Sequence, residues 1–390
     1  MIPTVSSAAF DDARGREYRW TQDAIYLNAA SWGPLPECSR RAGELFERQR
    51  QLGQLRDADL IHVQDQARHA VARLINAQTD EIALMPNTSS GLNLAAHLAT
   101  LRATSGRRTI VLSDREFPAN VYPWLALRRR GFQVRMVPTT ATGIPDEDAL
   151  ADALALPDVV AFSYSFVQFS TGFRGDLARF GRICRDRDIL FVVDAIQGLG
   201  AVPLDVQTFQ IDVLACGGQK WLCSPWGTGF VYLRSDLCRT LEPYLPGWLA
   251  YSASQDFTRL TGYACELRDD AQRFELGSQP FQACGAFAES VQLLLALGVA
   301  HVYQHNLALQ DRIVSWARAQ GDVQIVSHPT ARSGILCIRP ADAVTAHGAL
   351  LEAHVTCAFR EGAIRLSPHF YNSAAEIERV LATLELVLAP

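Results

Sequence analysis

Lys220 is the single lysine of the sequence, and all other members of its 36 basic residues are arginine. A lysine amine can lose its proton and attack a carbonyl carbon, whereas a guanidinium keeps its charge. Arginine can therefore replace lysine in ion pairs but not in Schiff-base chemistry. Two glycines, Gly217 and Gly218, precede Lys220 and let the backbone approach a cofactor. These surroundings favour a reactive lysine over a chance survivor.

Polar residues follow three of the predicted strands. Asn87-Thr88-Ser89-Ser90-Gly91 leads into a helix, where hydroxyl and N–H groups suit a phosphate, although a plain helix cap uses the same residues. Asp194 follows the fifth strand. It can hold a pyridine nitrogen protonated, and a helix cap or metal ligand is the alternative. Lys220 follows the sixth strand. A phosphate site, a carboxylate and an amine at one sheet edge predict pyridoxal 5'-phosphate (PLP) as cofactor.

The elements that must position these residues alternate between strands and helices. Helical patterns cover residues 91–102 and 177–186. The strand segments are mostly apolar without polar alternation, which is typical of a sheet covered on both faces. The predicted strands are 82–85, 109–113, 133–137, 159–163, 189–193, 213–216 and 229–233. They predict an α/β fold with a mainly parallel sheet of about seven strands. The short connection before the last strand suggests that one strand runs antiparallel.

The length of 390 residues predicts two domains. We expect a large PLP-binding α/β domain over residues 50–260 and a small C-terminal α/β domain over residues 261–390. The small domain starts with helical patterns at 283–297 and 302–320. Residues 1–49 are expected to pack on the small domain and the active site.

Composition and charge narrow the possible classes of binding partner and the cellular location. A net charge of −5 gives no reason to expect nucleic acid or an anionic membrane. No apolar run reaches about 20 residues, and no signal peptide is visible, so a cytoplasmic location is predicted. Nine scattered cysteines without a C-x-x-C pair suit a reducing compartment. His301 and His305 have metal-ligand spacing but no obvious third ligand, so no metal site is predicted.

The sequence resembles the class V aminotransferase family of fold-type I PLP enzymes, which includes cysteine desulfurases, isopenicillin N epimerase-like proteins and C–S lyases. The resemblance extends from Tyr26-Leu27-Asn28-Ala29-Ala30 to Ser367-Pro368-His369-Phe370-Tyr371-Asn372. Its most specific stretches are Val192-Val193-Asp194-Ala195-Ile196-Gln197 and Gly218-Gln219-Lys220-Trp221. It implies a fold-type I architecture with a smaller C-terminal domain.

The resemblance also implies roles for individual residues. Lys220 carries PLP as a Schiff base and moves the Cα proton, and Asp194 pairs with the pyridine nitrogen. The remaining cofactor contacts are assigned to Thr88, Ser89 and Gln219 at the phosphate, Gln197 at the ring hydroxyl, Phe117 stacked on the ring, and Ser278. Substrate contacts are assigned to Asn28, Ala29 and Arg365, where Arg365 binds the α-carboxylate. Ser278 reaches the phosphate of a neighbouring subunit, which implies a homodimer.

Some positions depart from the family pattern. Gly217 and Gln219 replace a serine and a histidine found in many relatives, and Phe117 replaces the histidine usual in desulfurases. The segment 360–365 is too short for the desulfurase cysteine loop and contains no cysteine, and Cys357 is expected in the core. A persulfide-forming desulfurase is therefore disfavoured.

An amino-acid substrate is expected, with transamination or related Cα chemistry first. PLP-dependent β-elimination, as in C–S or selenocysteine/cysteine lyases, and epimerisation are the alternatives. A lysine Schiff-base enzyme without PLP would have no use for Asp194 or the phosphate-type loop. A non-catalytic PLP-binding scaffold would have no use for a carboxylate-binding Arg365.

Overall fold

A computed structural model describes residues 7–256 and 258–388. The predicted domains also include residues 1–6, 257 and 389–390, which lie outside the described residues. A seven-stranded sheet forms the centre, in the order β2-β8-β7-β6-β5-β3-β4. Its strands are β2 (Ile82–Leu84), β3 (Thr109–Ser113), β4 (Gln133–Val137), β5 (Val159–Ser165), β6 (Leu190–Asp194), β7 (Val213–Gly217) and β8 (Gly229–Leu233).

The direction of the strands brings several loops to one edge of the sheet. β7, β6, β5, β3 and β4 are parallel, and β8 runs antiparallel to both β7 and β2. β2 therefore points the same way as β7. The mainly parallel sheet of seven strands with one reversed strand is confirmed, and so is the α/β class. The loops after β2, β3, β5, β6 and β7 all leave from the same, carboxyl edge.

Helices cover both faces of this sheet because its strands are apolar on both faces. Phe162, Phe191 and Leu214 point to the face that also packs against α3, α6, α7 and α9. Ile110 and Val192 point to the other face, against α4. The helices of this part are α3 (Asp57–Ile75), α4 (Thr88–Arg102), α5 (Tyr122–Ala126), α6 (Glu147–Leu154), α7 (Leu177–Asp186), α8 (Ser235–Thr240) and α9 (Phe281–Leu297).

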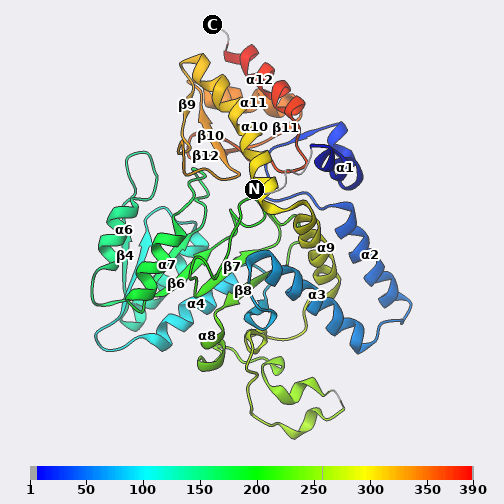
Figure 1. Ribbon diagram of the computed structural model, residues 1–390, viewed down its shortest axis with the longest axis vertical. Coiled ribbons are helices and arrows are strands. Elements are labelled where there is room, and N and C mark those ends of the chain that lie inside the picture. Colours follow the sequence, from blue (N-terminus) through cyan, green and yellow to red (C-terminus); the bar gives the residue numbers. More distant parts are fainter. Residues whose placement is uncertain (1–6, 257, 389–390) are drawn as a thin grey trace.

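The C-terminal part has its own core around an antiparallel sheet in the order β12-β13-β10-β9. It lies at the top of Figure 1, and β1 of the N-terminal segment pairs in parallel with its strand β11. Its elements are α10 (Val299–Gln320), β9 (Gln324–Ile325), β10 (Leu336–Arg339), α11 (Ala343–Glu352), β11 (Val355–Thr356), β12 (Ala358–Arg360), β13 (Ala363–Leu366) and α12 (Ala374–Leu388).

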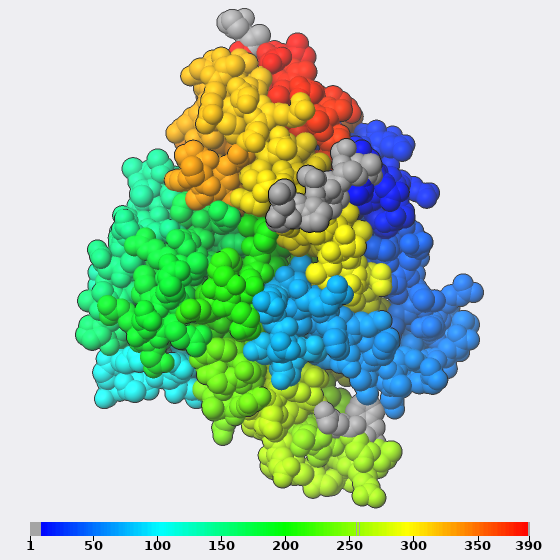
Figure 2. Space-filling view, viewed as in Figure 1, coloured from blue at the N-terminus to red at the C-terminus, as the bar shows by residue number. Residues whose placement is uncertain are grey.

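The N-terminal segment connects the two parts. It consists of α1 (Ser7–Glu17), β1 (Ile25–Tyr26) and α2 (Glu37–Gln51), and α2 and α3 both pack on α9. Residues 240–256 and 258–270, lime in Figure 2, project from the end opposite the C-terminal part. In the described part of the chain, no single helix has the length and apolarity of a membrane span. α9 and α10 reach that length and apolarity only when taken together, and they are bent by 74° relative to each other. The predicted domain boundaries stay a prediction.

Candidate active site

Lys220 lies just after β7, at the carboxyl edge of the sheet. Its Nζ is 5.4 Å from the centre of the Phe117 ring, which comes from the loop after β3. Burial lowers the pKa of Lys220 from its ordinary value of 10.5 to about 8, against the opposing charge of Asp194 and with the help of Arg365. Close to neutral pH, a sizeable fraction of this amine is therefore uncharged and nucleophilic.

Asp194 ends the adjacent strand β6 and is only 3% exposed. Its Oδ1 accepts a hydrogen bond from the N–H of Ile196 at 3.0 Å, and its Oδ2 accepts none from any described residue. Burial raises the pKa of Asp194 to about 6, and only Lys220 supplies a nearby opposing charge. A buried carboxylate with an unused oxygen fits a protonated pyridine nitrogen.

Thr88 and α4 form the next corner of the site, above the end of β7. The backbone N–H of Gly217 donates to Thr88 Oγ1 at 2.8 Å, which leaves the Thr88 hydroxyl proton for another acceptor. Asn87 caps α4 by accepting the N–H of Ser90, while other N–H groups of the first turn have no intrahelical partner. A Cβ atom at Gly91 would lie 2.8 Å from the Ala215 side chain, so this glycine lets α4 approach β7. The corner can hold a phosphate group.

Gln197 links the loop after β6 to two other segments. Its Nε2 donates to the Ala30 carbonyl at 3.0 Å, and its Oε1 accepts the indole N–H of Trp221 at 3.1 Å. One Nε2 proton remains for a ligand. Nδ1 of His369 accepts the N–H of Phe370, so Nε2 carries the proton and donates it to the Trp221 carbonyl at 2.9 Å. The loop that carries Lys220 is thus held from both the N-terminal and the C-terminal segments.

Arg365 is a buried cation without a counter-ion among the described residues. It lies on β13 and is 2% exposed. Nη1 donates to the Phe169 carbonyl and Nη2 to Ser31 Oγ, both at 2.9 Å, whereas the buried Nε has no partner. Burial lowers the pKa of Arg365 to about 10. An arginine that is buried without a carboxylate and lies near Lys220 fits the α-carboxylate of a substrate.

The predicted N-terminal residues lie beside this arginine. Ser31 Oγ also donates to Asn28 Oδ1 at 2.7 Å, so Asn28 reaches Arg365 only through Ser31. Ala29 is fully buried, and its N–H bonds the Ser367 carbonyl. Ser31 was not identified in the sequence, because nothing in its local pattern shows that it meets a residue 334 positions later.

Glu116 is a second residue that the sequence analysis missed. It precedes Phe117 and is buried, and this burial raises its pKa to about 7. Its carboxylate accepts from the Ser165 hydroxyl and N–H, from Asn120 Nδ2 at 2.9 Å and from Gln168 Nε2 at 3.0 Å. Glu116 thereby joins the loop that carries Phe117 to the loop that carries Phe169.

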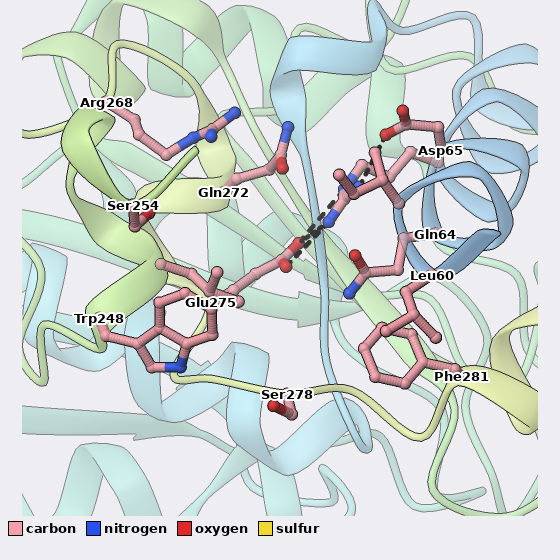
Figure 3. A pocket seen from close by; sticks show the side chains of 13 residues that line it. Leu60, Gln64, Asp65, Trp248, Ser254, Arg268, Gln272, Glu275, Ser278 and Phe281 are labelled. Atoms are coloured by element: carbon pink, nitrogen blue, oxygen red, sulfur yellow. Dashed lines mark hydrogen bonds and ion pairs between the residues drawn. The ribbon is translucent and has the colours of Figure 1, made fainter. Parts of the chain in front are cut away.

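Ser278 has no described hydrogen bond to the residues around Lys220, and none of them is in the described lining of its cavity. It lines a cavity of about 420 Å³ together with Leu60, Trp248 and Phe281 (Figure 3). Arg68 and Glu275 line the same cavity, and their buried ion pair at 2.9 Å ties α3 to the segment before Ser278. Ser89 and Ser278 are both exposed. Gln219 and Lys220 are half-buried by contrast.

The desulfurase-type loop has no counterpart in the hairpin of β12 and β13. Arg360 pairs with Ala363, so only two residues connect the strands. Cys357, just before β12, is buried, and burial raises the pKa of its thiol to about 12. Seven of the nine cysteines are buried, and the other two are Cys38 and Cys265.

Among known protein families, the aminotransferase class-V model matches residues 48–380 of this chain. The chain belongs to this family. A probable cysteine desulfurase from Methanothermobacter thermautotrophicus is 29% identical over 96% of this chain and 97% of its own length. An uncharacterized aminotransferase, YcbU of Bacillus subtilis, is 29% identical over 81% of each chain.

Solved structures agree on the fold. The cystine C–S lyase C-DES, in a mutant with glycine covalently linked to its PLP cofactor, superposes with a TM-score of 0.84 at 21% identity, over 94% of this chain and 98% of that chain. The predictions of a class V family member, of the fold-type I architecture and of a PLP-dependent enzyme are confirmed. The roles of individual residues stay predictions.

Proposed function

We propose that this PLP-dependent enzyme carries out transamination or related chemistry at the Cα of an amino acid. When bound, PLP draws electrons from the substrate Cα, so that a bond at that carbon can be broken. The observation that carries the proposal is the buried, uncompensated Arg365 close to the single lysine. A carboxylate-binding group next to an amine is what an α-amino acid substrate requires.

Lys220 would hold PLP and, once the substrate amine has replaced it, accept and return the Cα proton. Its pKa of about 8 supports both tasks, because the amine is a base in the physiological pH range. Arg365 would orient the substrate by a fork contact with the α-carboxylate, and Ser31 would fix the orientation of Arg365. Asn28 would support Ser31.

The cofactor would be held at four places. Asp194 would pair with the ring nitrogen through its unused oxygen, and the remaining amide proton of Gln197 would face the ring hydroxyl. Phe117 would cover the ring, as supported by its position over Lys220. Phosphate contacts would come from Thr88, Ser89 and Gln219 at the start of α4 and the end of β7.

β-Elimination is the second candidate outcome, and the similarity to a probable cysteine desulfurase over nearly the whole chain favours it. Both outcomes begin with removal of the Cα proton. Capture of sulfur as an enzyme persulfide is disfavoured, because Cys357 is buried and the 360–363 hairpin contains no cysteine. A lyase of this kind would release its leaving group to solvent or to a small acceptor.

We further propose a homodimer in which Ser278 serves the neighbouring site. Two observations support it: Ser278 is exposed at a cavity whose described lining includes no residue around Lys220, and large apolar side chains nearby are exposed, including Trp248 at 45% and Leu276 at 59%. The predicted cytoplasmic location stays a prediction, with which nine free cysteines agree.

The absorption spectrum tests the central proposal. The purified protein, or the protein supplied with PLP, is expected to show a visible band that is absent in Lys220→Ala and that changes when a substrate amino acid is added. Lys220→Arg is the control that keeps the charge without a titratable amine. A band that persists in Lys220→Ala would mean that PLP is not held by Lys220.

A further inference from the structure

A polar cleft of about 400 Å³ lies between the face of the small sheet and the large domain. Three arginines lie on its walls: Arg115 comes from the large domain, and Arg339 and Arg360 come from β10 and β12. Glu361 is the one acidic residue of its described lining. The cleft therefore carries a net positive charge, which attracts an anionic group.

The register of the small sheet places this cleft next to the substrate-carboxylate residue. In the antiparallel pair β12–β13, Arg360 lies opposite Ala363, and Ala358 lies opposite Arg365. Residues opposite one another, and residues two apart along a strand, share one face. Arg360 and Arg365 thus project from the same face as diagonal neighbours, about 7–8 Å apart at the backbone. Ala363, between them on this face, lines the cleft and leaves the space open.

The three cleft arginines differ in the hydrogen bonds and ion pairs that they form within the protein. The guanidinium of Arg339 donates to the Gly362 and Glu361 carbonyls and to Gln324, all at 3.1 Å. Arg115 lies 3.9 Å from the Glu361 carboxylate. Arg360 donates only to the carbonyl of Phe359 and forms no ion pair with a described residue. Arg360 is therefore the arginine that is left for a ligand.

We propose that Arg360 binds an acidic side chain of the substrate, so that the enzyme acts on dicarboxylic amino acids. This inference rests on the function proposed above, with Arg365 at the α-carboxylate. It names the substrate class of the same site. Two carboxylates of one aspartate- or glutamate-sized molecule span the separation of two guanidinium groups that project from diagonal positions.

Electrostatics support the placement. Burial is the largest cause of the shifted pKa of Lys220, followed by Asp194, Arg365 and Cys216. The charge of Arg360 is a smaller cause, and it lowers this pKa. After burial and Cys337, Arg360 also lowers the pKa of Arg365. Arg360 is thus close enough to act on both groups. A second carboxylate in the substrate would neutralise this extra positive charge, which a neutral side chain cannot do.

The first test compares acids with their neutral amides by titrating the visible band of the PLP-loaded enzyme. L-aspartate and L-glutamate are expected to reach half-saturation at concentrations at least about tenfold lower than L-asparagine and L-glutamine. Arg360→Gln should remove this preference and leave the amide values unchanged, and Arg360→Lys should restore part of it. Arg318→Gln, which removes an exposed arginine at the end of α10, is the matched control and should change nothing.

The contrary outcomes are distinct. Equal half-saturation for acids and amides in the wild type, or an equal loss of both in Arg360→Gln, would overturn the proposal. If no amino acid changes the band, the proposed function fails, and thermal unfolding with glutarate decides the present inference instead. Stabilisation by glutarate that is lost in Arg360→Gln supports a dicarboxylate site. No stabilisation, or equal stabilisation by butyrate or inorganic phosphate, contradicts it.

Discussion

The Oε1 atom of Gln219 lies only 2.4 Å from the place where a Cβ atom would stand on Gly217. These two residues replace the serine and histidine that many class V relatives carry at the same positions. The side chain of Gln219 thus uses the space that the missing side chain of Gly217 leaves.

Gly217→Ser alone should therefore overpack the end of β7. We expect a loss of about 1 kcal/mol in the free energy of unfolding, because the end of the Gln219 side chain must rotate away, and weaker retention of PLP, since Thr88 Oγ1 lies 3.3 Å from the same Cβ position. Thermal unfolding and the PLP content after dialysis measure the two effects. The double variant Gly217→Ser, Gln219→Ala should recover stability. If it does not, the two positions are independent.

Arg365→Gln should leave PLP bound and remove most of the response to amino acids. Loss of a charged fork contact to a carboxylate is expected to lower kcat/KM by about 100-fold or more, mainly through KM. Ser31→Ala should cost about 1 kcal/mol, or roughly fivefold, because it removes one hydrogen bond to Arg365 Nη2. Steady-state kinetics check both. Equal losses in the two variants would argue that Ser31 contacts the substrate itself.

The rate at which the PLP-free protein captures PLP should rise with pH and level off above about 8. Only the uncharged amine of Lys220 attacks the aldehyde, and burial lowers its pKa from 10.5 to about 8. The rate is followed by the visible band after mixing with PLP at pH 6 to 10. An increase that continues to pH 10 would show an ordinary lysine pKa and no effect of burial.

Glu116 should make the protein less stable as pH rises. Its pKa is about 7 in the folded state and near 4.5 in the unfolded state, so the folded protein binds the additional proton between these values. The resulting stabilisation is complete below about pH 4.5 and is lost as pH rises through 7. Its size is about 3 kcal/mol. Asp194, raised to about 6, acts in the same direction.

Glu116→Gln isolates this contribution, because the difference between variant and wild type removes the effect of Asp194. Denaturant unfolding at pH 5 and pH 8 should show a smaller decline for the variant. A positioning role predicts, in addition, that Glu116→Gln changes the absorbance of bound PLP through displacement of Phe117. Equal pH dependence in both proteins would mean that Glu116 is ionised throughout.

Mixed dimers test whether Ser278 crosses between subunits. Lys220→Ala and Ser278→Arg homodimers should both be inactive. After the two are unfolded and refolded together, a shared site predicts that roughly a quarter of wild-type activity returns, because half of the dimers are mixed and each has one intact site. Activity that stays absent would place Ser278 outside the neighbouring site. Refolding each variant alone is the control.

The local pattern was sufficient for the large sheet and insufficient for the contacts of the site. Seven apolar segments predicted β2 to β8, and the short connection after Cys216 predicted one antiparallel strand, which is β8 in the structure. Asp194 and Lys220 could be found because strand ends are visible in the sequence. The sequence did not reveal the roles of Ser31 and Glu116 or the hydrogen bond from Trp221 to Gln197. Their partners come from distant segments, and the local sequence around an ordinary polar residue does not indicate such a partner.

The parallel pairing of β1 with β11 has a consequence for how the protein comes into being. Ser31 and Arg365 are 334 positions apart, so Ser31 leaves the ribosome long before Arg365, and the two can contact each other only late in synthesis. The large sheet can form earlier, since β2 to β8 lie within residues 82–233. Capture of the cofactor can thus precede competence to bind substrate during biosynthesis.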